Sequence, residues 1–159
     1  MRKILLDNIK TGLSITIGPS VNTYADLPIE DILTFLPEQV AVNYFVGILI
    51  DKAETGRQEI GRYDPTVKKY SCMIVVLVKN LDEDLGQTEL DTIVNRIIKY
   101  LSKDQGNLVS AQKVKDGITE RVITYGIDKF DYSSIKGMDE GEMGHICGIS
   151  FNIRTDIII

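Results

Sequence analysis

The side chains that could most readily do chemistry lie near the end of the sequence. Residues 140–159, EGEMGHICGISFNIRTDIII, contain the only histidine, His145, and one of the two cysteines, Cys147. If this segment is a strand, a spacing of two places both side chains on the same face. The pair could belong to a metal site or a Cys–His nucleophile, or it could be two ordinary strand residues.

A metal site needs more ligands than this pair supplies. A zinc site requires two further ligands of suitable type, but no other histidine exists and Cys72 is expected in the core. Asp139, Glu140 and Glu142 are close in sequence, yet MDEGEMG lacks the regular alternation of oxygen ligands found in calcium-binding loops. We therefore expect no metal site and no cofactor.

Nucleophilic, acid–base and nucleotide chemistry have no better support. A Cys–His pair needs contact between imidazole and sulfur and a third group that orients the imidazole, and no conventional active-site turn surrounds His145. No glycine-rich turn of the Walker or Rossmann type is present, and no two carboxylates form a defensible acid–base pair. The sequence predicts no catalytic residues and a protein that is not an enzyme.

Composition indicates a single folded domain. The 159 residues include 43% hydrophobic and 26% charged residues, which are ordinary globular values. The net charge of −5 argues against a surface that holds nucleic acid. The widely separated cysteines suit a reducing compartment, and neither a signal peptide nor a membrane-spanning run is visible. We expect a soluble protein that is made in the cytoplasm and has no membrane partner.

The first half of the chain predicts a helix followed by strands. The helix over 2–15 is predicted from apolar residues at four-residue steps, namely Leu5, Ile9 and Leu13. A connector over 18–38 precedes a strand over 39–51, which is dense in β-branched and aromatic residues. Residues 51–63 then predict a projecting hairpin.

Turn signals and charges support that hairpin. Gly56 marks its turn, and Asp64-Pro65 marks another turn after it. Arg57 and Arg62 alternate poorly with apolar residues, which is typical of an edge or a projecting ribbon.

The middle of the chain predicts a central strand followed by a long helix. Residues 70–79, YSCMIVVLVK, are apolar on both faces, so the strand should be covered above and below, with Cys72 in the core as a small hydrophobe. Asp84 with Gln87 is predicted to cap the helix. Acidic residues at the helix start could bind a cation, but they also complement the helix dipole, which explains them without a ligand. The apolar stripe consists of Leu90, Ile93, Val94, Ile97, Ile98 and Leu101.

The remainder predicts short strands and a long loop. Strands over 108–114 and 120–128 are joined at Asp116-Gly117, a strong hairpin signal. Residues 127–144 predict a long loop, because they lack a sustained period. The terminal segment predicts a half-buried strand whose apolar positions are Ile149, Phe151, Ile153 and Ile157. The expected fold is one α+β domain over 1–159, a mostly antiparallel sheet with two main helices packed on it.

The order of these elements resembles that of the tail terminator, or tail completion, proteins of tailed bacteriophages and their relatives at the head–tail joint. The segment KYSCMIVVLVKNLDEDLGQTELDTIVNRIIKYL, over about 69–101, carries most of the resemblance, since a strand there runs directly into a long helix. The final strand GISFNIRTDIII adds support. The connector over 18–38 and the loop over 127–144 are longer than in the core of that family.

The resemblance implies a structural virion protein of the tail or neck. Copies of the chain would form a ring, commonly a hexamer, that ends the tail tube and meets the head–tail connector proteins. DNA would pass through the lumen without specific binding, which suits an acidic chain. Contacts with other subunits or partners are predicted at residues on elements that a lone core does not explain: Arg57, Arg62, Asp139, Glu140 and Glu142.

Two alternatives use the same sequence features differently. The first is another interaction protein, such as a neck, head-completion or baseplate component of a phage or phage-like particle. The second is a small ligand-binding or enzymatic α+β domain with a cleft near His145. Partner purification separates the first from a terminator, and a His145→Ala variant tests the second.

Overall fold

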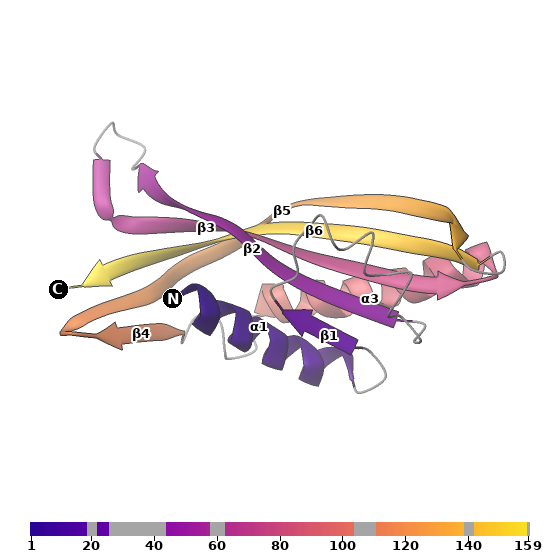
Figure 1. The fold of residues 1–159 in the computed structure, drawn as a ribbon, viewed down its shortest axis with the longest axis horizontal. Helices are drawn as coiled ribbons and strands as arrows, with labels where there is room; N and C mark the ends of the chain where they lie inside the picture. Colours follow the sequence, from indigo (N-terminus) through magenta and orange to yellow (C-terminus); the bar gives the residue numbers. More distant parts are fainter. Residues whose placement is uncertain (19–21, 26–43, 58–62, 104–110, 139–141, 159) are drawn as a thin grey trace.

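The α+β prediction is confirmed by the computed structural model, which describes residues 1–18, 22–25, 44–57, 63–103, 111–138 and 142–158. Within these residues one six-stranded sheet has the order β1-β2-β3-β6-β5-β4, and every ladder except the parallel β1–β2 pair is antiparallel. The sheet is long and twisted, with both helices on one face (Figure 1). In chain order the elements are α1 (Arg2–Ile17), β1 (Asn22–Ala25), β2 (Tyr44–Arg57), β3 (Tyr63–Asn80), α3 (Glu83–Lys103), β4 (Gln112–Lys115), β5 (Ile118–Met138) and β6 (Glu142–Ile158).

The two helices build the main core against the sheet. The predicted stripe of α3 is buried apart from Ile98, which is partly buried, and Ile97 within it is fully inaccessible. Leu5, Ile9 and Leu13 of α1 are also fully buried, as their spacing predicts. One apolar cluster joins both helices to β2, β3 and β6. Burial of these amphipathic faces, at about 25 cal/mol per Å² of apolar surface, is the main force that holds the helices on the sheet.

Strand β3 is central, as its sequence predicts. Cys72, Ile74 and Val76 face the helices, and Cys72 is 4% exposed. Val75 and Leu77 on the opposite face are buried as well. The strand is apolar on both faces because both faces are buried. A strand made of consecutive hydrophobic residues usually has this environment.

The hairpin between β2 and β3 is longer than its turn signals suggest. β2 continues past Gly56 to Arg57, so the turn predicted at Gly56 is wrong. The Asp64-Pro65 turn is wrong too, because these residues lie inside β3. The ladder between β3 and β6 begins only at Val67, so no β6 partner requires an N–H group from Pro65. In Figure 1 the ends of β2 and β3 curl away from the rest of the sheet.

The predicted loop over 127–144 is replaced by a second long hairpin. β5 runs to Met138 and β6 begins at Glu142, and the two strands pair along almost their whole length. The hairpin predicted at Asp116-Gly117 is confirmed, with φ values of 53° and 77° that suit a tight turn. Most of the connector over 18–38 lies outside the described residues, although Asn22–Ala25 within it forms β1.

The start of α3 is capped two residues earlier than predicted. The Leu85 N–H donates to the Asp82 carboxylate at 3.0 Å, and the Asp82 N–H donates to the Asn80 side-chain oxygen at 2.9 Å. Asp82 is therefore the N-cap, and Asp84 lies in the first turn. The sequence offered several acidic residues in a row, and only the backbone geometry distinguishes which one precedes the helix.

We expect Asp82→Ala to lower the free energy of unfolding by about 1 kcal/mol, because it removes an N-cap acceptor. Asp84→Ala removes only a favourable charge near the helix dipole and should cost a few tenths of a kcal/mol. Urea unfolding followed by circular dichroism measures both. Equal losses in the two variants would contradict the assignment of the cap.

Candidate functional site

The predicted contact residues are placed at two different ends of the sheet. Arg57 ends β2, where it pairs with Tyr63, whereas Glu142 starts β6 beside the end of β3. Nothing is described for their side chains, and Arg62, Asp139 and Glu140 lie outside the described residues. The structure does not bring Arg57 and Glu142 together, and their role in contacts stays a prediction.

His145 and Cys147 are core residues of β6, as the strand interpretation predicts. They lie opposite Val78 and Val76 of β3 and are 1% and 0% exposed. The His145 ring packs under Gly86 of α3, and neither ring nitrogen has a hydrogen-bond partner within the described part of the chain. Among the described residues no group of three or more His, Cys, Asp or Glu side chains is arranged to hold a metal ion.

Burial also determines the chemistry of the two thiols. Burial raises the pKa of Cys72 to about 12. Burial raises the pKa of Cys147 as well, against a smaller lowering by a hydrogen bond with Tyr132. Both sulfurs are therefore held as neutral thiols, which are poor nucleophiles.

We expect neither cysteine of the folded protein to react detectably with Ellman's reagent at pH 8, because both thiols are buried and protonated. Both should react after unfolding in guanidinium chloride, where the pKa of a cysteine returns to about 8.5. Absorbance at 412 nm follows the reaction. Rapid modification of one thiol in the folded state would contradict this view and would revive the nucleophile hypothesis.

A polar network lies at the other end of the sheet, around Glu120 of β5. Glu120 is only 7% exposed. Its Oε1 accepts hydrogen bonds from the hydroxyls of Tyr70 and Thr155, each at 2.8 Å, and its Oε2 lies 3.7 Å from the Lys68 ammonium group. Burial, and then the hydrogen bond to Glu120, raise the pKa of Tyr70, so its hydroxyl stays a donor. These groups give the Glu120 carboxylate hydrogen bonds and a counter-charge, without which its burial would be costly.

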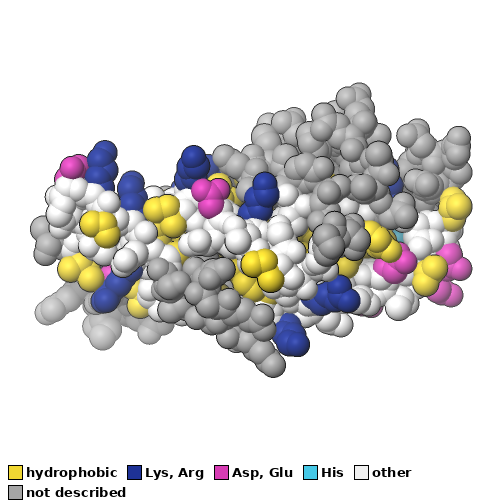
Figure 2. All heavy atoms as spheres, turned by 90° about the horizontal axis from the view of Figure 1, so that it is seen from below, with side chains coloured by type: hydrophobic (Ala, Val, Ile, Leu, Met, Phe, Trp, Pro, Cys, Tyr) yellow, Lys and Arg dark blue, Asp and Glu magenta, His cyan; other side chains and the backbone are white. Residues whose placement is uncertain are grey.

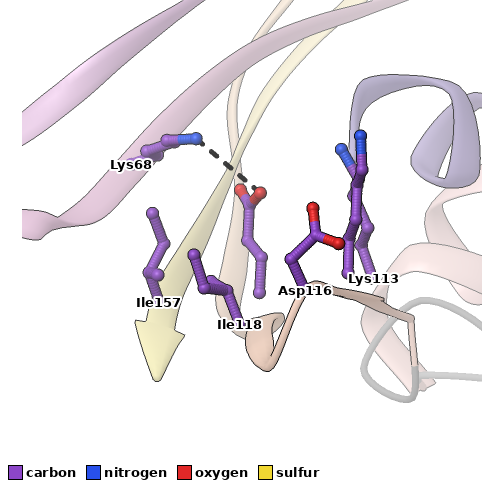
Figure 3. Close-up of a pocket in the computed structure, with 7 residues that line it drawn as sticks. Lys68, Lys113, Asp116, Ile118 and Ile157 are labelled. Atoms are coloured by element: carbon purple, nitrogen blue, oxygen red, sulfur yellow. Dashed lines mark ion pairs between the residues drawn. The ribbon is translucent and has the colours of Figure 1, made fainter. Parts of the chain in front are cut away.

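A hollow of about 300 Å³ opens beside this network (Figure 3). In the view of Figure 3, Ile118 and Ile157 stand on one side of the Lys68–Glu120 pair, and Asp116 and Lys113 stand on the other. We call this hollow the lysine pocket. Its lining residues are Lys68, Lys113, Lys115, Asp116, Ile118, Glu120 and Ile157.

Strand register explains why the lining residues converge. Lys113 lies opposite Glu120 across the β4–β5 ladder, and Lys115 lies opposite Ile118. Glu120 in turn lies opposite Ile157 of β6. Alternate residues of a strand point to the same face, so three strands deliver these side chains to one place. In the sequence QKVK, Lys113 and Lys115 are two residues apart and so share one face of a strand. This spacing is the sequence signal that could have predicted the pocket.

The lysine pocket has the chemistry of a contact for an acidic and partly apolar group. Lys68 forms an ion pair with Glu120. The other charged groups that line the pocket are the ammonium groups of Lys113 and Lys115 and one carboxylate, that of Asp116. The isoleucines supply apolar wall beside these charges. A volume near 300 Å³ is at the lower limit of small-molecule sites, so it suits one or two side chains better than a large cofactor.

Comparison with known proteins gives no family for this chain. No family model matches it, and no curated protein matches it either. No helix among the described residues is both long enough and apolar enough to cross a membrane.

Proposed function

We propose that this chain is a structural subunit of a tailed-bacteriophage particle, a tail terminator that forms a ring at the head–tail joint. The order of elements supports this proposal. α1 comes first, β3 passes into α3 through only Leu81 and Asp82, and β6 ends the described chain. The same order carries the resemblance of the sequence to tail terminators.

The observation that carries the proposal is the position of the exposed apolar side chains. One group, Val114, Ile118 and Ile158, lies on β4, β5 and β6 at the end where the chain turns from β4 to β5. Ile118 is on the face of the sheet that carries Lys115, and Val114 and Ile158 are on the other face. A second group, Leu81 and Leu85, lies at the start of α3. Exposed apolar groups of this kind commonly mark protein contacts.

Two different surfaces at opposite ends favour head-to-tail association. When one end of a subunit binds the other end of the next, the contact is heterologous, and it closes into a ring if the rotation between subunits allows it. A ring of acidic subunits would let DNA pass, because like charges do not adhere. The net charge of −5 is consistent with that role.

Oligomer size and binding to tail tubes test the proposal. We expect mass photometry at micromolar concentration to show a ring, or a monomer that becomes a ring when tail tube protein is added. Negative-stain microscopy should then show the rings at tube ends. Binding to the head–tail connector without capping of tubes would instead assign the chain to the neck, and a strict monomer that ignores tail components would overturn the proposal.

Matched variants locate the contact surfaces. Leu85→Ser and Ile118→Ser each remove an apolar side chain from one end, where the exposed fractions are 52% and 44%. Both should weaken assembly at least tenfold. Ile15→Ser is the control, since Ile15 is 75% exposed on α1 and belongs to neither end group.

A further inference from the structure

The lysine pocket presents unmatched positive charge beside apolar surface. All four residues of β4 are exposed, including Lys113 and Lys115. Across the described residues, neither lysine takes part in an ion pair with a carboxylate. Ile118, which is 44% exposed, and Ile157 line the same pocket. The pocket therefore offers ammonium groups and apolar wall together, in a protein whose net charge is negative.

The start of α3 presents the opposite combination. Leu81 is 71% exposed and Leu85 is 52% exposed, and the exposed carboxylates of Glu83 and Asp84 lie between them. Figure 2 shows hydrophobic and acidic side chains together at the end of the molecule where α3 begins. The leucines are unusual at such exposed positions, because nothing in the helix start requires an apolar residue there.

The two surfaces cannot meet within one molecule. Lys68 lines the pocket, and Asn80 immediately precedes Leu81 at the far end of the same strand, β3. At about 3.3 Å per residue, the strand between them spans roughly 40 Å. Figure 1 likewise shows the β4–β5 hairpin and the start of α3 at opposite ends of the sheet.

We propose that the lysine pocket of one copy receives the Leu81–Leu85 segment of a second copy. Glu83 and Asp84 approach Lys113 and Lys115, and the two leucines cover Ile118 and the neighbouring apolar wall. Opposite charges fix the orientation of such a contact and exclude the like-charged alternatives, pocket to pocket or helix start to helix start. The contact is heterologous, because it joins two different surfaces. It rests on the proposed function, since it would be the interface between neighbouring subunits of the proposed ring.

A charge exchange tests this contact. The first variant carries Lys113→Glu and Lys115→Glu, and the second carries Glu83→Lys and Asp84→Lys. Asp82 is left unchanged in both, because it caps α3. We expect each variant alone to assemble at least tenfold more weakly than the wild-type chain in mass photometry, since like charges then face each other.

Restoration is the decisive readout. An equimolar mixture of the two variants restores complementary pairs at each joint, and so does one chain that carries all four substitutions. Both should regain most of the wild-type assembly. The control, Lys10→Glu with Lys99→Glu, makes the same change of net charge as the Lys113/Lys115 variant at exposed helix positions and should assemble normally. Circular dichroism verifies that every variant is folded.

The outcomes separate this contact from the proposed function. If the wild-type chain forms rings that neither charge reversal weakens, or that the mixture fails to restore, the contact is wrong while the ring-forming role stands. If the pocket variant still forms rings but no longer binds tail tubes, the pocket receives an acidic partner and the second copy is wrong as its occupant. If the wild-type chain is a monomer even with tail tubes, both proposals fail.

Discussion

Glu120→Ala is expected to lower the free energy of unfolding by about 3–5 kcal/mol. The substitution leaves the buried hydroxyls of Tyr70 and Thr155 without their shared acceptor, and it leaves Lys68 without a partner. Each buried hydroxyl left without an acceptor costs about 1–3 kcal/mol, since it has already lost its contact with water, and the two hydroxyls account for most of the expected loss. Chemical denaturation followed by circular dichroism measures the change.

Glu120→Gln is the matched control for this prediction. The amide oxygen of glutamine can still accept hydrogen bonds from both hydroxyls, so only the charge interaction with Lys68 is lost. The Lys68 side chain is 35% exposed, and a pair with such access to solvent contributes about 1 kcal/mol or less. Equal destabilisation by alanine and glutamine would show that the hydroxyl network contributes little and that the Lys68 pair is the main interaction.

The central strand and the long helix were predictable from sequence because their patterns are unbroken. Every second residue from Tyr70 to Val78 faces the helices, and the residues between them include buried Val75 and Leu77. α3 keeps its apolar stripe from Leu90 to Leu101. In a regular helix or strand, the spacing of apolar residues alone determines which residues share a face. The element can therefore be recognised as helix or strand from its own residues, without information from the rest of the chain.

β5 was not predictable as one strand because bulges interrupt its period. Its register with β6 shifts between Val122 and Thr124, between Ile127 and Lys129, and between Ile135 and Met138. Each shift inserts a residue, so the positions that face the helices are separated by two or three residues. Their partners on β6, by contrast, alternate regularly. The residues of β5 on this face include Glu120, Val122, Tyr125, Ile127, Phe130 and Tyr132.

The same irregularity explains why the lysine pocket was not predicted from the sequence. With a strict alternation, Glu120 would be assigned to the wet face of a strand together with other polar residues. Pairing with Lys113 on one side and Ile157 on the other places it instead on the face toward the helices. These partners lie far apart in sequence, and their convergence depends on long-range register, which no local pattern specifies.

His145 explains why Gly86 is a glycine. A methyl group added at Gly86 would contact the His145 ring, which is buried beneath α3. Glycine is otherwise unfavourable inside a helix by about 1 kcal/mol relative to alanine. The close approach of helix and strand is therefore maintained at the expense of helix propensity.

The cost of Gly86→Ala should consequently depend on the residue at position 145. In the wild-type background we expect a loss of about 2 kcal/mol in the free energy of unfolding, because overpacking against a buried ring outweighs the gain in helix propensity. In the His145→Ala background only the close approach to the Asn80 Cβ, at 3.1 Å, remains, so the same substitution should cost at least about 1 kcal/mol less than in the wild-type background. Denaturant unfolding of the four proteins in this double-mutant cycle gives the coupling energy.

Gly12→Ala provides the specificity control for the cycle. A methyl group at Gly12 would contact the ring of Tyr100, not that of His145, so its cost should be the same in both backgrounds. If Gly86→Ala destabilises both backgrounds equally, the His145 ring is not what excludes a side chain there. If His145→Ala alone abolishes assembly while the fold is intact, the imidazole has a role beyond packing, and the interpretation of His145 as a core residue is wrong.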